Sequence, residues 1–129
     1  MNRIRILIID NHEAVRRALN IRLGAHNQIE VVGVAANPDE ALAQMAFIRP
    51  DVVILGLQNG SDDDLIRTVF AVRDMVAETP IVIVLAPYAD AVERELLLQA
   101  GAKRYLLKHI NSRKLIQEIE TVASAGASV

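Results

Sequence analysis

Short apolar runs alternate along the chain with longer stretches of mixed polarity. The runs hold four to six residues and are rich in isoleucine, leucine and valine, and the first of them is flanked by polar residues. They cover residues 4–9, 29–34, 52–55, 81–85 and 103–107. Short runs of this composition are typical of strands that are buried on both faces of a sheet. The fifth run is the least apolar, because Lys103 and Arg104 open it.

The stretches between the runs carry apolar residues three and four positions apart, which predicts helices. The clearest examples are Val15, Ala18, Leu19 and Leu23; Leu65, Val69, Val72 and Val76; and Leu115, Ile119, Val122 and Ala123. Strands separated by helices of this length pair in parallel through right-handed crossovers. The pattern therefore predicts a three-layer α/β protein of five strand–helix units around a parallel sheet.

Capping residues support these helices. Asn37 is followed by Pro38 and by Glu40, which is the arrangement of a capped helix start with proline in the first turn. Residues 61–64, with the sequence SDDD, resemble a capping box with additional acid at the positive end of a helix. Gly101 follows the fourth helical pattern, where a glycine commonly ends a helix.

Composition narrows the class of protein. The 129 residues fit one domain, and an apolar share of 52% is enough for a core. The chain contains no cysteine, which excludes disulfides, thiolate catalysis and cysteine-based metal sites. A net charge of −2 argues against a nucleic-acid module. Because the sequence shows no apolar stretch near 18 residues and no signal peptide, we expect a cytoplasmic domain without a membrane partner.

The candidate chemistry lies where the strands end. In a parallel sheet, the carboxyl ends of the strands gather at one edge, and ligands bind there. The residues that close the runs are Asp10 with Asn11, then Gly56, then Ala86, then Lys108. Among these residues Asp10 is the one acid and Lys108 the one base. Gly56 lies between them without a side chain, and we expect this centre of the site to be vacant.

Four stretches resemble the receiver domain of bacterial two-component response regulators, most closely those of the LuxR/NarL type that carry a helix-turn-helix. They read IRILIIDNHEAVRRAL, IEVVGVAANPDEAL, RPDVVILGL and AGAKRYLLK. The resemblance implies a flavodoxin-like fold with strand order 2-1-3-4-5 and a role in phosphorelay signalling and transcription regulation, without enzymatic turnover. It assigns residues 1–124 to the receiver domain. Residues 125–129 would be a tail, or the start of a linker to an effector domain that this chain does not contain.

In that family an acidic pair, an acceptor aspartate, a Thr or Ser and a Lys form the phosphoacceptor site. Carried over by position, the first acid is Asp10, the second is replaced by Asn11, the acceptor by Gly56 and the hydroxyl by Ala86, while the Lys is kept as Lys108. Phosphoryl transfer needs a nucleophile and cations that offset charge, and Mg²⁺ prefers carboxylate oxygens. The resemblance therefore implies a degenerate pseudo-receiver that binds Mg²⁺ weakly or not at all and has no resident cofactor.

Four residues of this site have two interpretations. Gly56 is either an emptied acceptor position or a turn glycine that needs a positive φ. Asp10 and Lys108 form either a constitutive latch or a partly exposed salt bridge. Tyr105 stands at the family's aromatic switch position, but it also fits a half-buried strand residue.

The sequence leaves other functions open. A genuine phosphoacceptor would have to use another acid, such as those at positions 62–64, and would regulate a LuxR-type DNA-binding domain outside this chain. A flavin or nucleotide site would need a glycine-rich loop after the first strand, where residues 10–13 read DNHE. We expect protein partners, either a second copy of the chain in a homodimer or a sensor kinase, and contact with DNA only through an effector domain.

Overall fold

Strands and helices alternate strictly in the computed structural model, which describes residues 2–58, 62–79 and 81–127. The elements are β1 (Ile4–Ile9), α1 (Glu13–Gly24), β2 (Ile29–Ala35), α2 (Pro38–Ile48), β3 (Val52–Gly56), α3 (Asp62–Glu78), β4 (Ile81–Ala86), α4 (Ala91–Ala100), β5 (Arg104–Leu107) and α5 (Ser112–Ala127). All five expected strands and their intervening helices are present, which confirms the predicted strand–helix alternation. The helix α5 continues through Ala127, while residues 128–129 of the expected tail lie outside the described part of the chain.

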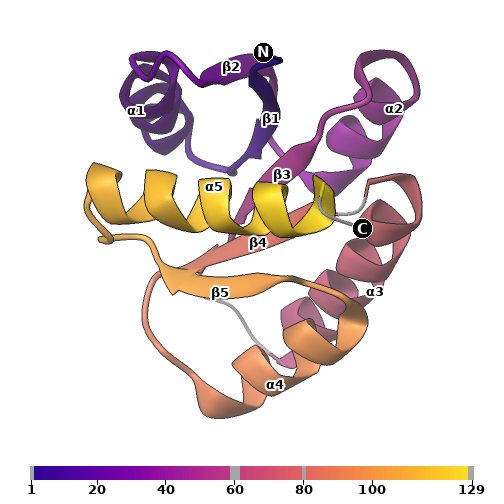
Figure 1. The fold of residues 1–129 in the computed structure, drawn as a ribbon. Helices are drawn as coiled ribbons and strands as arrows, with labels where there is room; N and C mark the ends of the chain where they lie inside the picture. The colour runs from indigo at the N-terminus through magenta and orange to yellow at the C-terminus, as the bar shows by residue number, and fades with distance from the viewer. Residues whose placement is uncertain (1, 59–61, 80, 128–129) are drawn as a thin grey trace.

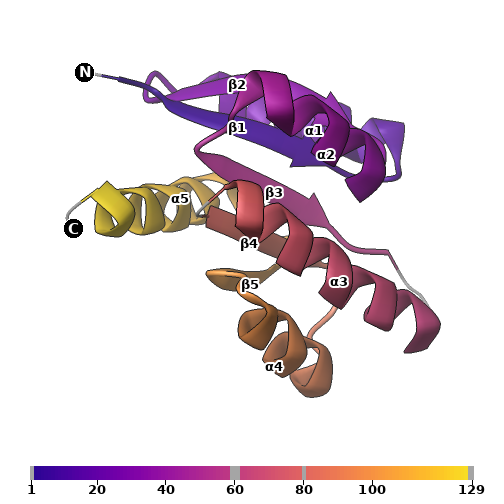
Figure 2. The same ribbon diagram turned by 90° about the vertical axis from the view of Figure 1, so that its right-hand side faces the viewer.

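The sheet is parallel with the order β2-β1-β3-β4-β5, which confirms the fold class. Helices α1 and α5 pack on one face and α2, α3 and α4 on the other (Figures 1 and 2). β1 shows how the sequence produces these layers, because alternate residues of a strand point to opposite faces. Leu7 and Ile9 join the core under α2, α3 and α4, and Ile6 and Ile8 join the core under α1 and α5.

The strands β2, β3 and β4 are each one residue longer than the apolar pattern predicts, and the residues added to β3 and β4 are candidate site residues. β3 includes Gly56, which pairs with Leu85 of β4, and β4 includes Ala86, which pairs with Leu107 of β5. Both added residues are small and buried, so that they continue the strands without disturbing the packing. The ladder therefore fixes the backbone of two candidate site residues.

Capping of α2 and α4 follows the sequence. Asn37 Oδ1 accepts a hydrogen bond from the backbone N–H of Glu40 at 2.9 Å, and Glu40 Oε2 accepts one from the N–H of Ala36 at 2.9 Å. Gly101 ends α4 with a φ of 122°, a conformation that favours glycine. The expected cap at Ser61 lies outside the described residues.

Replacing Asn37 with alanine tests the first of these caps. We expect an Asn37→Ala chain to lose about 1 kcal/mol of unfolding free energy, because the N–H of Glu40 loses its acceptor. Urea denaturation followed by circular dichroism measures the change. Asn27→Ala is the matched control, because Asn27 is exposed in a turn and should lose little. Equal losses in the two variants would contradict the capping role.

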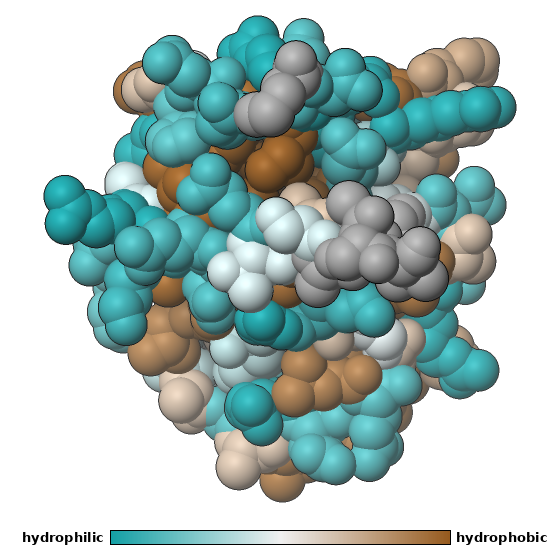
Figure 3. Space-filling model, in the orientation of Figure 1, coloured by the Kyte–Doolittle hydropathy of each residue, from teal (hydrophilic) through white to brown (hydrophobic). Residues whose placement is uncertain are grey.

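The molecular surface is mixed. Hydrophilic side chains cover much of the face on which α5 lies, with apolar patches between them (Figure 3). Within the described residues, none of the helices combines the length and apolar character that crossing a membrane requires.

Candidate functional site

Asp10 occupies the centre of the site at the carboxyl end of β1. Its side chain is fully buried, with a relative exposure of 0%. Oδ1 accepts hydrogen bonds from the backbone N–H of His12 at 2.9 Å and from Nε2 of Gln58 at 3.1 Å. Oδ2 lies 2.8 Å from Nζ of Lys108, at an angle outside the usual hydrogen-bond range. Oδ1 is thus satisfied by two donors, and Oδ2 by the charge of one lysine.

Lys108 reaches Asp10 from the other half of the sheet. Its backbone N–H donates to the carbonyl of Ala86 at 2.8 Å, which extends the ladder past the end of β5. The side chain is 20% exposed, and its partner carboxylate is not exposed at all. The pair is therefore partly exposed on the lysine side only, because the carboxylate of Asp10 is fully buried.

Gly56 lies directly against this carboxylate. A Cβ atom built at Gly56 would stand 2.1 Å from Oδ2 of Asp10 and 3.0 Å from its Cγ, well inside van der Waals contact. The expectation of a vacant centre is therefore wrong, because Asp10 fills it. The turn interpretation also fails, since the positive φ values among the described residues belong to Arg49 and Gly101. With the Asp10 carboxylate in this position, any residue larger than glycine at position 56 would require the carboxylate or the strand to move.

The other expected site residues offer little to a cation. Asn11 is exposed on the loop after β1, and Ala86 is buried at the end of β4 without a polar atom in its side chain. Within the described residues no group of three acids or histidines could hold a metal. Mg²⁺ prefers several oxygen ligands, commonly carboxylates, and the carboxylate here already faces Lys108. This set of residues does not fit Mg²⁺.

Tyr105 lies half-buried on β5, as the strand interpretation expects. Its hydroxyl donates a short hydrogen bond to Oε1 of Glu93 on α4 and stands 3.5 Å from the carbonyl oxygen of Tyr88. Burial is the larger cause that raises the pKa of Tyr105 well above its ordinary value, and the hydrogen bond to the Glu93 carboxylate raises it further. The phenol therefore remains a neutral donor that ties β5 to α4.

Sequence reasoning missed Gln58 and Glu93. Gln58 follows β3 and donates to the buried carboxylate, and Glu93 accepts from the phenol of Tyr105. The position of Gln58, two residues after Gly56, was the available signal, because side chains after a strand end point into the same edge of the sheet. Glu93 carried no such signal, since it resembles any exposed acid in the first turn of a helix.

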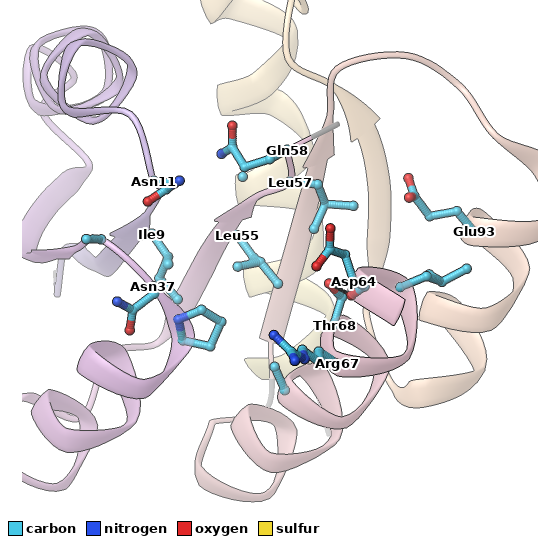
Figure 4. A pocket seen from close by; sticks show the side chains of 15 residues that line it. Ile9, Asn11, Asn37, Leu55, Leu57, Gln58, Asp64, Arg67, Thr68 and Glu93 are labelled. Carbon is cyan, nitrogen blue, oxygen red and sulfur yellow. Dashed lines mark hydrogen bonds between the residues drawn. The ribbon is translucent and has the colours of Figure 1, made fainter. Parts of the chain in front are cut away.

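A cavity of about 440 Å³ opens beside this centre. It lies between the ends of β1 and β3, the start of α2 and the N-terminal part of α3 (Figure 4). Its apolar wall comes from Ile9, Leu55, Leu57, Leu65 and Ala71. Its polar lining includes Asn11, Asn37, Gln58, Asp64, Arg67, Thr68 and Glu93. Gly56 also lines it, so that the cavity and the buried carboxylate share one wall.

Comparisons with known proteins agree on a single family. The model of the response regulator receiver domain matches residues 6–120. The chain is 32% identical to the DNA-binding transcriptional activator DevR/DosR of Mycobacterium tuberculosis over 98% of the chain and 57% of that protein. It is 32% identical to the transcriptional regulatory protein LiaR of Bacillus subtilis over 93% of the chain and 56% of that protein. The chain thus spans little more than half the length of these relatives.

A solved structure repeats the fold. The two-component response regulator of the LuxR family from Aurantimonas sp. SI85-9A1 superposes with a TM-score of 0.81 at 22% identity. The match covers 96% of this chain and 87% of that one. At this identity the likeness concerns the fold alone.

Proposed function

Since this chain belongs to the response regulator receiver domain family, we propose that it is a regulatory module of two-component signalling that works without accepting a phosphoryl group. In this proposal the chain is a pseudo-receiver, and it regulates by binding rather than by turnover. Its active conformation is set by contacts among its own residues and with partners.

One observation carries the proposal: the 2.1 Å between a Cβ at Gly56 and Oδ2 of Asp10. The family's nucleophile is an aspartate at the position of Gly56, and here another carboxylate fills the space where that side chain would begin. Lys108 already holds this carboxylate at 2.8 Å. The latch interpretation of the pair follows, because an incoming phosphoryl group would find neither a nucleophile in line nor an unengaged lysine.

The remaining losses support the same proposal. Ala86 has no hydroxyl that could engage a phosphoryl oxygen, and the donor set around Asp10 does not fit Mg²⁺. Tyr105 instead bonds to Glu93, which gives the aromatic position a partner that does not depend on phosphorylation.

The relatives suggest where such a module acts. DevR/DosR is described as a DNA-binding transcriptional activator, and LiaR as a transcriptional regulatory protein. We propose that this chain likewise serves transcription regulation in the cytoplasm, through an effector domain outside it that makes any contact with DNA. A second copy of the chain or a sensor kinase is the partner this role requires.

Incubation with a small phosphodonor tests the central claim. With acetyl phosphate and Mg²⁺, we expect the intact mass of the folded chain to stay unchanged, because the acceptor position carries no oxygen. A receiver domain that retains the acceptor aspartate serves as the reaction control. An added phosphoryl group on this chain, for example on an acid at positions 62–64, would overturn the proposal and support the alternative of a genuine phosphoacceptor.

Restoring the missing aspartate extends this test. A Gly56→Asp chain should also remain unlabelled, since Asn11 and Ala86 still lack the groups that bind Mg²⁺ and the phosphoryl oxygens. The same mass measurement decides, with circular dichroism to confirm folding. Normal Mg²⁺-dependent labelling of this variant would show that Asn11 and Ala86 do not prevent phosphorylation, and would contradict this part of the proposal.

A further inference from the structure

The cavity beside the buried carboxylate is large enough for a small organic ligand. Its volume of about 440 Å³ lies within the range of known small-molecule sites. The buried side chains of Ile9, Leu55 and Leu57 form its floor at the sheet edge, and Leu65 and Ala71 of α3 form one side. Such a wall removes apolar ligand surface from water, which is the main source of affinity in sites of this kind.

Most polar groups of the lining already have partners within the protein. Asn37 caps α2, Gln58 donates to Asp10, and Glu93 accepts from Tyr105. The hydroxyl of Thr68 donates to the carbonyl of Asp64 at 2.7 Å. These groups shape the cavity but have little left to offer a ligand.

Arg67 differs from them. No hydrogen bond or ion pair joins its guanidinium to the described part of the chain, and the side chain extends from α3 into the space toward the start of α2 (Figure 4). It is the one cation of the described lining. A guanidinium beside an apolar wall is suited to a carboxylate or similar anion, which it can bind through two parallel hydrogen bonds.

We propose that this cavity binds a small amphipathic anion, whose apolar body lies on the floor of Leu55 and Leu57 and whose charged group pairs with Arg67. The inference rests on the proposed function, because it supplies a ligand signal for a receiver that takes no phosphoryl group. The ligand class is a monoanion with a compact aromatic or aliphatic body.

Two lining residues connect the cavity to the centre of the site. Gln58 lines the cavity and also donates to Oδ1 of Asp10, and Glu93 lines it and accepts from Tyr105. A ligand that displaces either side chain changes the contacts of the buried carboxylate or of β5. Occupancy would thereby reach Asp10 at the end of β1 and Tyr105 on β5.

Binding of 2-naphthoate and of its neutral amide, 2-naphthamide, to the ¹⁵N-labelled chain tests the proposal. We expect saturable shifts of the backbone N–H signals of β3 and α3, and of the side-chain amide of Gln58. We also expect naphthoate to bind about tenfold more tightly than the amide, since only the anion gains a charge-assisted contact. Shifts confined to other elements, shifts that leave Gln58 unmoved, or no saturable shift would overturn the inference.

Paired arginine variants locate the charge. Arg67→Gln should bring the affinity for naphthoate down to that for naphthamide, about tenfold, without changing the binding of the amide. Arg73→Gln is the matched control, because Arg73 is exposed on the same helix and stacks over the Phe70 ring at 5.9 Å, away from the cavity lining. Equal losses in the two variants would overturn the role of Arg67.

The outcomes separate the two proposals. A phosphoryl adduct in the mass experiment would overturn the proposed function whatever naphthoate does. Failure of naphthoate to bind a chain that takes no phosphoryl group would overturn the ligand site alone.

Discussion

A Gly56→Ala chain should unfold with a free energy lower by about 3 kcal/mol, because one methyl group enters space that the Asp10 carboxylate already fills. At 2.1 Å from Oδ2 the new Cβ cannot be tolerated, so that either β3 shifts or the carboxylate leaves its position. β3 is buried between β1 and β4, and its ladder resists a shift. Departure of the carboxylate would break its contact with Lys108 and both hydrogen bonds to Oδ1.

Urea denaturation monitored by circular dichroism measures this loss against Gly24→Ala. Gly24 ends α1, and the heavy atom nearest to a Cβ there is Oδ1 of Asn20 at 3.8 Å, an ordinary contact. Alanine at that position should be neutral or stabilising by up to about 1 kcal/mol. If Gly56→Ala were equally well tolerated, Asp10 would be able to leave its place without cost, and the latch would be excluded.

A double variant separates the clash from other effects of alanine at position 56. In an Asp10→Ala background the carboxylate is gone, and Gly56→Ala should then cost about 1 kcal/mol or less. The non-additivity measures the contact between the two positions. Additive losses would show that alanine acts on β3 itself rather than on Asp10.

The second large effect is expected at Lys108. A Lys108→Met chain should lose about 3–5 kcal/mol of unfolding free energy, because it leaves the Asp10 carboxylate buried without its counter-ion. The hydrogen bonds from His12 and Gln58 remain, but both reach Oδ1, and Oδ2 loses the charge that it faces. Adding Asp10→Asn to this variant should recover part of the loss, since a neutral amide costs less to bury than a carboxylate.

An exposed ion pair of the same length provides the control. Arg17 Nη2 lies 2.8 Å from Oε1 of Glu13, as Lys108 Nζ does from Oδ2 of Asp10, but both side chains are at least 70% exposed. Arg17→Met should therefore cost only about 0.5 kcal/mol. Burial, not distance, separates the two predictions. Similar losses at the two positions in urea denaturation would contradict the assignment of Asp10–Lys108 as a structural latch.

The fold was predictable because its signals are local. The apolar runs place β1 and β4 within one residue of their observed bounds. Asn37 marks a helix start through its side-chain acceptor, and Gly101 marks a helix end through its positive φ. β5 was the weakest prediction, because Lys103 and Arg104 interrupt its apolar pattern. Its pairing with β4 compensates, with Tyr105 opposite Val84 and Leu106 opposite Leu85.

By itself, the sequence determined the order of strands and helices, the buried character of the sheet and the absence of an acidic side chain at Gly56. Only the tertiary structure decided what replaces that side chain. The donor Gln58 and the acceptor Asp10 are 48 residues apart in sequence, and their contact depends on strand register and side-chain rotamer. The local spacing of apolar residues predicts neither the register nor the rotamer. The space beside Gly56, which the sequence leaves without a side chain, is therefore filled by Asp10 from the neighbouring strand.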